Sequence, residues 1–164
     1  MRERLWKELK QSKHNEIYCT QLIAYSRWLM NVMNLVVLLF SGSGIIMGWK
    51  IWKELPLISC VIISVIQVVK IAIPHLLPSE KQIKKLEVVN DFYFTYFNEI
   101  EALWYDHYHS RILDKEAQTR FYKIKAKEKG INKQVNEVVK RVNNRINKKA
   151  TMLTDQYFKQ TFNV

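Results

Sequence analysis

Residues 28–49 read WLMNVMNLVVLLFSGSGIIMGW, the longest stretch of this chain without a charged residue. As a helix these 22 residues extend about 33 Å, enough to cross a hydrocarbon core of about 30 Å. Arg27 and Lys50 flank the stretch, and tryptophans stand at both of its ends, where membrane proteins place amphipathic rings. The stretch therefore predicts a first transmembrane helix.

A second apolar stretch covers residues 55–77 and carries one basic residue, Lys70, near its end. With the short connection at 50–54 it predicts a transmembrane hairpin over residues 28–78, in which Lys70 reaches the interface or faces protein. Six Lys/Arg precede the hairpin, two lie in its loop and seventeen follow residue 78. The positive-inside rule then places both termini in the cytoplasm. The alternative is a buried helical hairpin in a soluble protein.

Both predicted spans carry a polar or small face. In the first span Arg27, Asn34, Ser41 and Gly48 recur every seven residues, Asn31 lies one turn before Asn34, and Gly44 and Gly48 form a GxxxG pair. In the second span the corresponding stripe is Cys60, Ser64, Gln67, Lys70 and Pro74. Amides facing lipid are costly, so these faces should meet protein or water. One hairpin cannot enclose a water path, and we expect a homo-oligomeric pore; oligomeric packing without conduction needs the same residues. Which stripe lines the pore stays open.

The rest of the chain reads as helix. We expect an N-terminal amphipathic cytoplasmic helix over residues 1–27 and a cytoplasmic helical bundle over 79–164. Within the bundle, helices are predicted at 81–111, at 115–129 with Gly130 as the C-terminal cap, and from 131 to beyond 153. The predicted core stripe of the first of these is Ile83, Leu86, Val89, Tyr93, Phe97, Ile100 and Trp104. The fold class is an all-α membrane protein. Such stripes suit a monomeric bundle and coiled-coil association equally well.

Positive charge is concentrated late in the chain. Residues 111–149 hold thirteen Lys/Arg and four Asp/Glu, a net charge of +9 within a total of +11. The candidate residues for an anionic ligand are Lys133, Lys140, Arg141, Arg145 and Lys148, with asparagines between them. Basic and amide side chains suit phosphates and base edges. A solvated face attracted to anionic lipids is the alternative.

No catalytic motif stands out. The chain has no Walker loop, nucleophile elbow or convincing pair of carboxylates, so we expect no enzyme, no cofactor and no catalytic residues. Asp106, His107 and His109 lack a fourth zinc ligand and favour a polar cluster. The aromatic run FYFTYF at 92–97 suits a packed core better than base stacking. Cys19 and Cys60 are expected to be packed thiols.

Three segments together resemble the SLATT family of bacterial two-span proteins: SRWLMNVMN at 26–34, IWKELP at 51–56, and NDFYFTYFNEIEALWYDHYHSR at 90–111. The resemblance covers nearly the whole length and rests on architecture. It implies a pore-forming effector of a bacterial antiphage system in the inner membrane, with a tetramer as the favoured oligomer. A partner nucleotidyltransferase would make the nucleotide or oligonucleotide signal that gates the pore, and permeabilisation would arrest or kill the cell.

Two other functions stay open. One is a non-conducting, membrane-anchored scaffold that binds nucleic acid, and the other is a holin-like toxin that needs no nucleotide.

Overall fold

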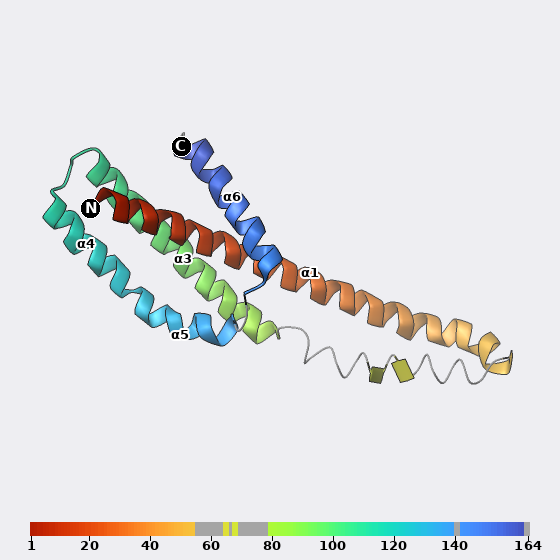
Figure 1. Cartoon of the computed structure of the whole chain (residues 1–164). Helices are drawn as coiled ribbons and strands as arrows, with labels where there is room; N and C mark the ends of the chain where they lie inside the picture. The colour runs from red at the N-terminus through yellow and green to blue at the C-terminus, as the bar shows by residue number, and fades with distance from the viewer. Residues whose placement is uncertain (55–63, 66, 69–78, 140–141, 163–164) are drawn as a thin grey trace. The chain divides into compact units, whose positions relative to one another are not determined.

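The structure is a computed structural model of residues 1–164, and it describes all of them except 55–63, 66, 69–78, 140–141 and 163–164 (Figure 1). The side chains of residues 37 and 39–54 are also outside the description. The described part is helical and contains no strand, which confirms the all-α class. Its helices are α1 (Arg2–Glu54), α3 (Glu80–Tyr108), α4 (Asp114–Ala126), α5 (Glu128–Val138) and α6 (Asn144–Phe162).

Helix α1 belongs to both of the compact units into which the chain divides. Residues 1–23 and 82–164 form the first unit, and residues 24–81 form the second. The N-terminal helix and the first apolar stretch, which the sequence suggested as separate segments, are therefore parts of one 53-residue helix.

The first unit is built on the N-terminal part of α1 and on α3. One cluster of buried side chains joins these helices to α4 and α6 through Leu5, Phe97, Phe121 and Phe158, all at most 2% exposed. A second cluster joins them to α5 and α6, with Tyr18, Val89, Ile131 and Ile146 among its members. All seven residues of the predicted α3 stripe are buried, which confirms that prediction. The packing role expected of FYFTYF is confirmed for Tyr93, Tyr96 and Phe97, which are buried, whereas Phe94 is 52% exposed.

Helix α3 ends in a Schellman motif. The Arg111 N–H donates to the Asp106 carbonyl (2.8 Å) and the Ser110 N–H to the His107 carbonyl (3.1 Å). Ser110 sits at the left-handed position of this motif, with a φ of 55°. Glycine is the residue that adopts this conformation without a steric cost.

Replacing Ser110 with glycine is therefore expected to stabilise the first unit by about 0.5–1 kcal/mol, because relief of the left-handed strain exceeds glycine's entropy cost. Urea unfolding monitored by circular dichroism measures this. A fall in stability would contradict the role of Ser110 as a strained cap.

Gly130 does not end a helix, and the prediction that it does is wrong. Helix α4 ends at Ala126, and a single residue, Lys127, separates it from α5. Lys127 keeps helical angles (φ −64°, ψ −29°), while the Lys127 N–H donates to the Ile124 carbonyl and the Gly130 N–H to the Lys127 carbonyl. These i→i−3 bonds tighten the backbone locally, so Gly130 lies within α5 rather than after it.

Gly130→Ala is expected to stabilise the first unit by about 0.5 kcal/mol, because a helical alanine loses less backbone entropy than glycine. A Cβ atom at this position would meet nothing within 4 Å. The same urea titration checks the result, and destabilisation would mean that glycine is needed at the α4–α5 junction.

The predicted single helix from residue 131 to beyond 153 is also wrong. Helix α5 ends at Val138 and α6 begins at Asn144. The Asn143 side chain caps α6, since its Oδ1 accepts from the backbone N–H groups of Arg145 (3.0 Å) and Ile146 (3.3 Å). Asparagine competes with the helix for backbone partners, and here the cap replaces continuation of the helix.

The second unit contains the rest of α1 and a few described residues of the following stretch, among which 64, 65, 67 and 68 are helical. Several of its large apolar side chains are exposed, Leu38 at 68% and Val68 at 65%. Among the residues that the structure describes, no helix has both the length and the apolar character that crossing a membrane requires.

Candidate ligand-binding cleft

A cleft of about 280 Å³ lies in the first unit, where α1, α3, α5 and α6 meet. Helix α1 contributes five of its lining residues, α3 and α6 contribute one each, and the rest come from α5 and the link that follows it. The lining residues are Gln11, His14, Asn15, Tyr18, Cys19, Tyr93, Val135, Val139, Val142 and Asn147.

One part of the lining is made of polar side chains. The Gln11 Nε2 donates to the Asn15 Oδ1 (2.9 Å) along α1. The Thr151 hydroxyl donates to the Asn147 carbonyl (3.0 Å), and the His14 Nε2 lies 3.4 Å from the same hydroxyl oxygen. The Nδ1 atom is buried and has no hydrogen-bond partner among the described residues.

The other part of the lining is apolar and neutral. Burial raises the pKa of the Cys19 thiol to about 12. Burial, with a smaller contribution from the charge of Glu128, raises the pKa of Tyr93 to about 12. Both groups therefore keep their protons at neutral pH. Cys19 is buried and free, as the sequence predicted, while Cys60 lies outside the described residues.

Tyr18 connects the cleft to the start of α6. Its ring stacks on that of His14, with centroids 6.5 Å apart and planes 17° apart. Its hydroxyl oxygen accepts from the backbone N–H of Asn143 (3.1 Å), the residue that caps α6. A ligand in the cleft would therefore touch α1 beside the contact that fixes the beginning of α6.

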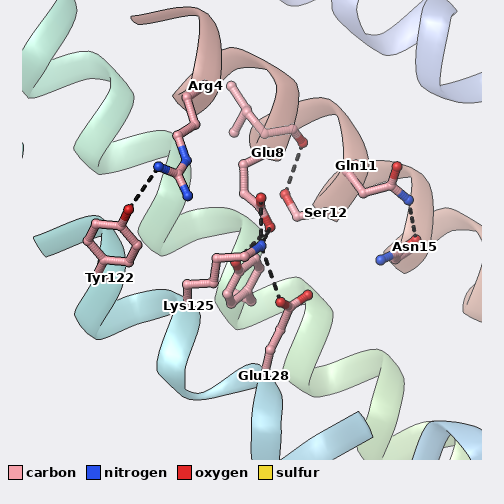
Figure 2. A network of polar contacts seen from close by, with 10 residues as sticks. Arg4, Glu8, Gln11, Ser12, Asn15, Tyr122, Lys125 and Glu128 are labelled. Carbon is pink, nitrogen blue, oxygen red and sulfur yellow. Dashed lines mark hydrogen bonds and ion pairs between the residues drawn. The ribbon is translucent and has the colours of Figure 1, made fainter. Parts of the chain in front are cut away.

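A polar network holds the part of α1 just before the cleft (Figure 2). The Glu8 carboxylate accepts from Lys125 Nζ at 2.8 Å on both oxygens and from the Tyr96 hydroxyl at 2.8 Å. Lys125 also lies 3.4 Å from Glu128. Burial works against the charge of Lys125, but the hydrogen bonds and the charge of Glu8 outweigh it and raise its pKa. The network fixes α1 to α3, α4 and α5 one turn before Gln11.

Three of the basic residues suggested by the sequence are described, and these three lie outside the lining. Lys133 is on α5, and Arg145 and Lys148 are on α6 three residues apart, all three exposed. Arg145 and Lys148 lie within one turn of Asn147, which does line the cleft. Lys140 and Arg141 lie outside the described residues. Sequence reasoning missed the α1 contribution; the signal was the run of polar residues Gln11, His14 and Asn15 between buried Leu9 and buried Tyr18.

The predicted pore or packing residues are described only in part. Asn31 and Asn34 are exposed on α1, and Ser64 and Gln67 are exposed in helical backbone. For Ser41, Gly44 and Gly48 the helical backbone of α1 is described but the side chains are not, and Lys70 lies outside the described residues.

The side chains near residue 107 are held by one histidine–aspartate hydrogen bond and by aspartate–arginine ion pairs. The His107 Nε2 lies 2.5 Å from the Asp114 Oδ1, and this bond lowers the pKa of Asp114. Asp106 pairs with Arg111 (3.7 Å) and Arg120 (3.5 Å). These contacts fix the link between α3 and α4. Within the described part of the chain no group of three His, Cys, Asp or Glu side chains is arranged to hold a metal ion.

Comparison of the chain with protein-family models, with curated proteins and with solved structures gives no match.

Cys19 is expected to resist alkylation in the folded protein. Its thiol is 4% exposed, and a pKa near 12 leaves little thiolate, the reactive form, at pH 8. In a Cys60→Ser background, iodoacetamide labelling followed by mass spectrometry should show at least about tenfold slower modification than in urea. Labelling at the same rate in both states would show that the cleft does not enclose this thiol.

Proposed function

We propose that this chain is a homo-oligomeric channel of the bacterial inner membrane and the toxic effector of an antiphage system. A nucleotide or oligonucleotide made by a partner nucleotidyltransferase gates it, and the open channel permeabilises the membrane and stops growth. The proposal follows the resemblance to the SLATT family. The membrane assignment rests on the sequence of residues 28–49 and 55–77.

The observation that carries the proposal is the exposure of large apolar side chains beside exposed amides in the second unit. Trp28, Leu35 and Leu38 are each more than half exposed in the single chain, and Asn31 and Asn34 are exposed between them. Soluble monomers rarely leave such surface uncovered, because its transfer out of water is favourable. Lipid and neighbouring copies can cover the apolar side chains, and water or a partner helix can satisfy the amides.

The continuity of α1 supports gating. The same helix lines the cleft through Gln11, His14 and Asn15 and continues without a break through residues 28–49. A ligand that binds more tightly to one arrangement of α1 in the first unit would shift the population of pore states by that difference in affinity. Anionic lipids would contact the basic flanks at Arg27 and Lys50.

The test is ion flux from liposomes that contain the full chain and anionic lipid, with and without added nucleotides. The proposal predicts flux that changes with the nucleotide, and nucleotide binding that weakens as salt rises because counterions are released. Binding without flux under any condition would favour the membrane-anchored scaffold. Flux that is the same with and without nucleotides, and that Arg145→Glu does not change, would favour the holin-like toxin.

A further inference from the structure

The cleft suits a neutral ring rather than an anion. Among the lining side chains that the structure describes there is no lysine, arginine, aspartate or glutamate, and the Cys19 and Tyr93 groups stay protonated at neutral pH. A phosphate placed among these side chains would lose its hydration without gaining an ion pair from them, which is costly. The described lining therefore favours an uncharged part of a ligand.

The polar lining offers carboxamides from two helices. Gln11 and Asn15 on α1 and Asn147 on α6 each combine a hydrogen-bond donor with an acceptor. Such a group can pair with the edge of adenine by two hydrogen bonds, one to N7 and one from the N6 amino group. The rings of Tyr18 and Tyr93 and three valines supply the apolar contact that a flat ring needs.

The size of the cleft limits the ligand. Its volume of about 280 Å³ is just below the range of roughly 300–1,000 Å³ that is usual for small-molecule pockets. One base or nucleoside fits this volume, and the remainder of an oligonucleotide would extend over the surface.

Positive charge lies outside the cleft, on the first turns of α6. Arg145 and Lys148 are exposed, and neither of them forms an ion pair with an acidic side chain among the described residues. Helix α6 also has no acidic residue in its first turn. Cations at a helix N-terminus oppose the helix dipole, so this arrangement weakens α6 unless an anion covers it. Phosphates attached to a base in the cleft would supply that anion.

We infer that the cleft between α1 and α6 is the base-recognition pocket for an adenine nucleotide, with Asn147 reading the base and Arg145 and Lys148 holding its phosphates. The identity of the ligand as a nucleotide rests on the proposed function. The assignment of the base to the cleft and of the phosphates to Arg145 and Lys148 rests on the residues that the structure describes there.

The test is isothermal titration of the detergent-solubilised full chain with adenosine, adenosine 5′-monophosphate, uridine and ribose 5-phosphate. Adenosine should bind, uridine should bind at least about tenfold more weakly, and the monophosphate should bind more tightly than adenosine at low salt. Ribose 5-phosphate matching the monophosphate would overturn the inference, because charge alone would then explain binding. Absence of adenosine binding would overturn it as well.

Two lining variants and one matched control locate the site. Asn147→Leu and Gln11→Met each remove a carboxamide from the lining and should weaken adenosine binding about tenfold. Asn144→Leu removes a carboxamide that is also on α6 but is not among the lining residues. This control variant should leave adenosine binding unchanged. Arg145→Glu should weaken binding of adenosine 5′-monophosphate and leave binding of adenosine unchanged. Equal effects of Asn147→Leu and Asn144→Leu would contradict the assignment.

These titrations separate the pocket from the channel. Adenosine binding that is lost in both lining variants supports the pocket even if liposomes never conduct. Nucleotide-dependent flux that persists in both lining variants supports the channel and overturns the pocket.

Discussion

Replacing Glu8 with alanine is expected to destabilise the first unit by about 2 kcal/mol. The Glu8 side chain is 16% exposed and accepts hydrogen bonds from Lys125 and Tyr96. Its removal leaves the Tyr96 hydroxyl, in a side chain 2% exposed, without its acceptor and separates Lys125 from its closest partner. Breaking a fully buried pair costs about 3–5 kcal/mol, and the 38% exposure of Lys125 reduces that cost because water can solvate the ammonium.

The matched control is Asp155→Ala. Asp155 pairs with Lys10 at 3.6 Å, and both side chains are about half exposed, so its loss should cost less than about 0.5 kcal/mol. Urea unfolding of both variants by circular dichroism gives the comparison. Equal effects of the two substitutions would show that the Glu8 network adds nothing beyond a surface ion pair.

The same network makes stability depend on alkaline pH. The pKa of Tyr96 is raised, by burial first and then by its hydrogen bond to Glu8, and the pKa of Lys125 is raised by Glu8 despite burial. A raised pKa in the folded state stabilises the protein below the unfolded values of 10.0 and 10.5. That stabilisation is lost as pH rises through the folded values, so the free energy of unfolding should fall above about pH 10. The fall should be smaller in Glu8→Ala.

Gly44→Leu is expected to reduce liposome flux at least about tenfold. In lipid, helices associate through close packing at small residues, and a leucine at the GxxxG pair holds the backbones apart. A loss of about 1.4 kcal/mol at one interface lowers the association constant tenfold, and a ring repeats that loss at every interface. Asn34→Leu should lower flux too, because it removes an amide from the polar face.

Ile46→Leu is the control for Gly44→Leu, because it keeps the volume and, at about 100° per residue, lies on the opposite side of the helix from the GxxxG pair. Its flux should match that of the unaltered chain. Flux that survives both Gly44→Leu and Asn34→Leu would refute a pore built on this face.

The sequence was most informative where one periodicity extends over many turns. The stripe from Ile83 to Trp104 follows the 3.6-residue period for about six turns, and every member is buried. The start of α3 at Glu80 is one residue from the predicted start at residue 81, so this boundary was also foreseen. Both signals are local, so no tertiary information was needed.

Helix ends within the basic block were not foreseen, for local reasons as well. Gly130 resembles a C-terminal cap, but Lys127 keeps helical angles and the chain continues into α5. Asn143 was counted among residues suited to a ligand, whereas its side chain caps α6. Glycine and asparagine serve at caps and elsewhere, so residue type alone does not decide between these uses.

The cleft could not be derived from the sequence, because its residues converge from distant segments. Gln11 and Asn147 are separated by more than a hundred residues and share a cavity only after α6 packs beside α1. The pattern of positive charge did indicate the part of α6 that borders the cleft, since Arg145 and Lys148 lie within a turn of Asn147. It did not indicate that the described lining of the cleft holds no lysine, arginine, aspartate or glutamate.

The central claim is that copies of this chain assemble around water through the segment at 28–49. Native mass spectrometry of the full chain released from detergent measures the number of copies directly. The account predicts one closed oligomer, with a tetramer favoured, that dissociates in Gly44→Leu. A single copy at every protein concentration would contradict the account.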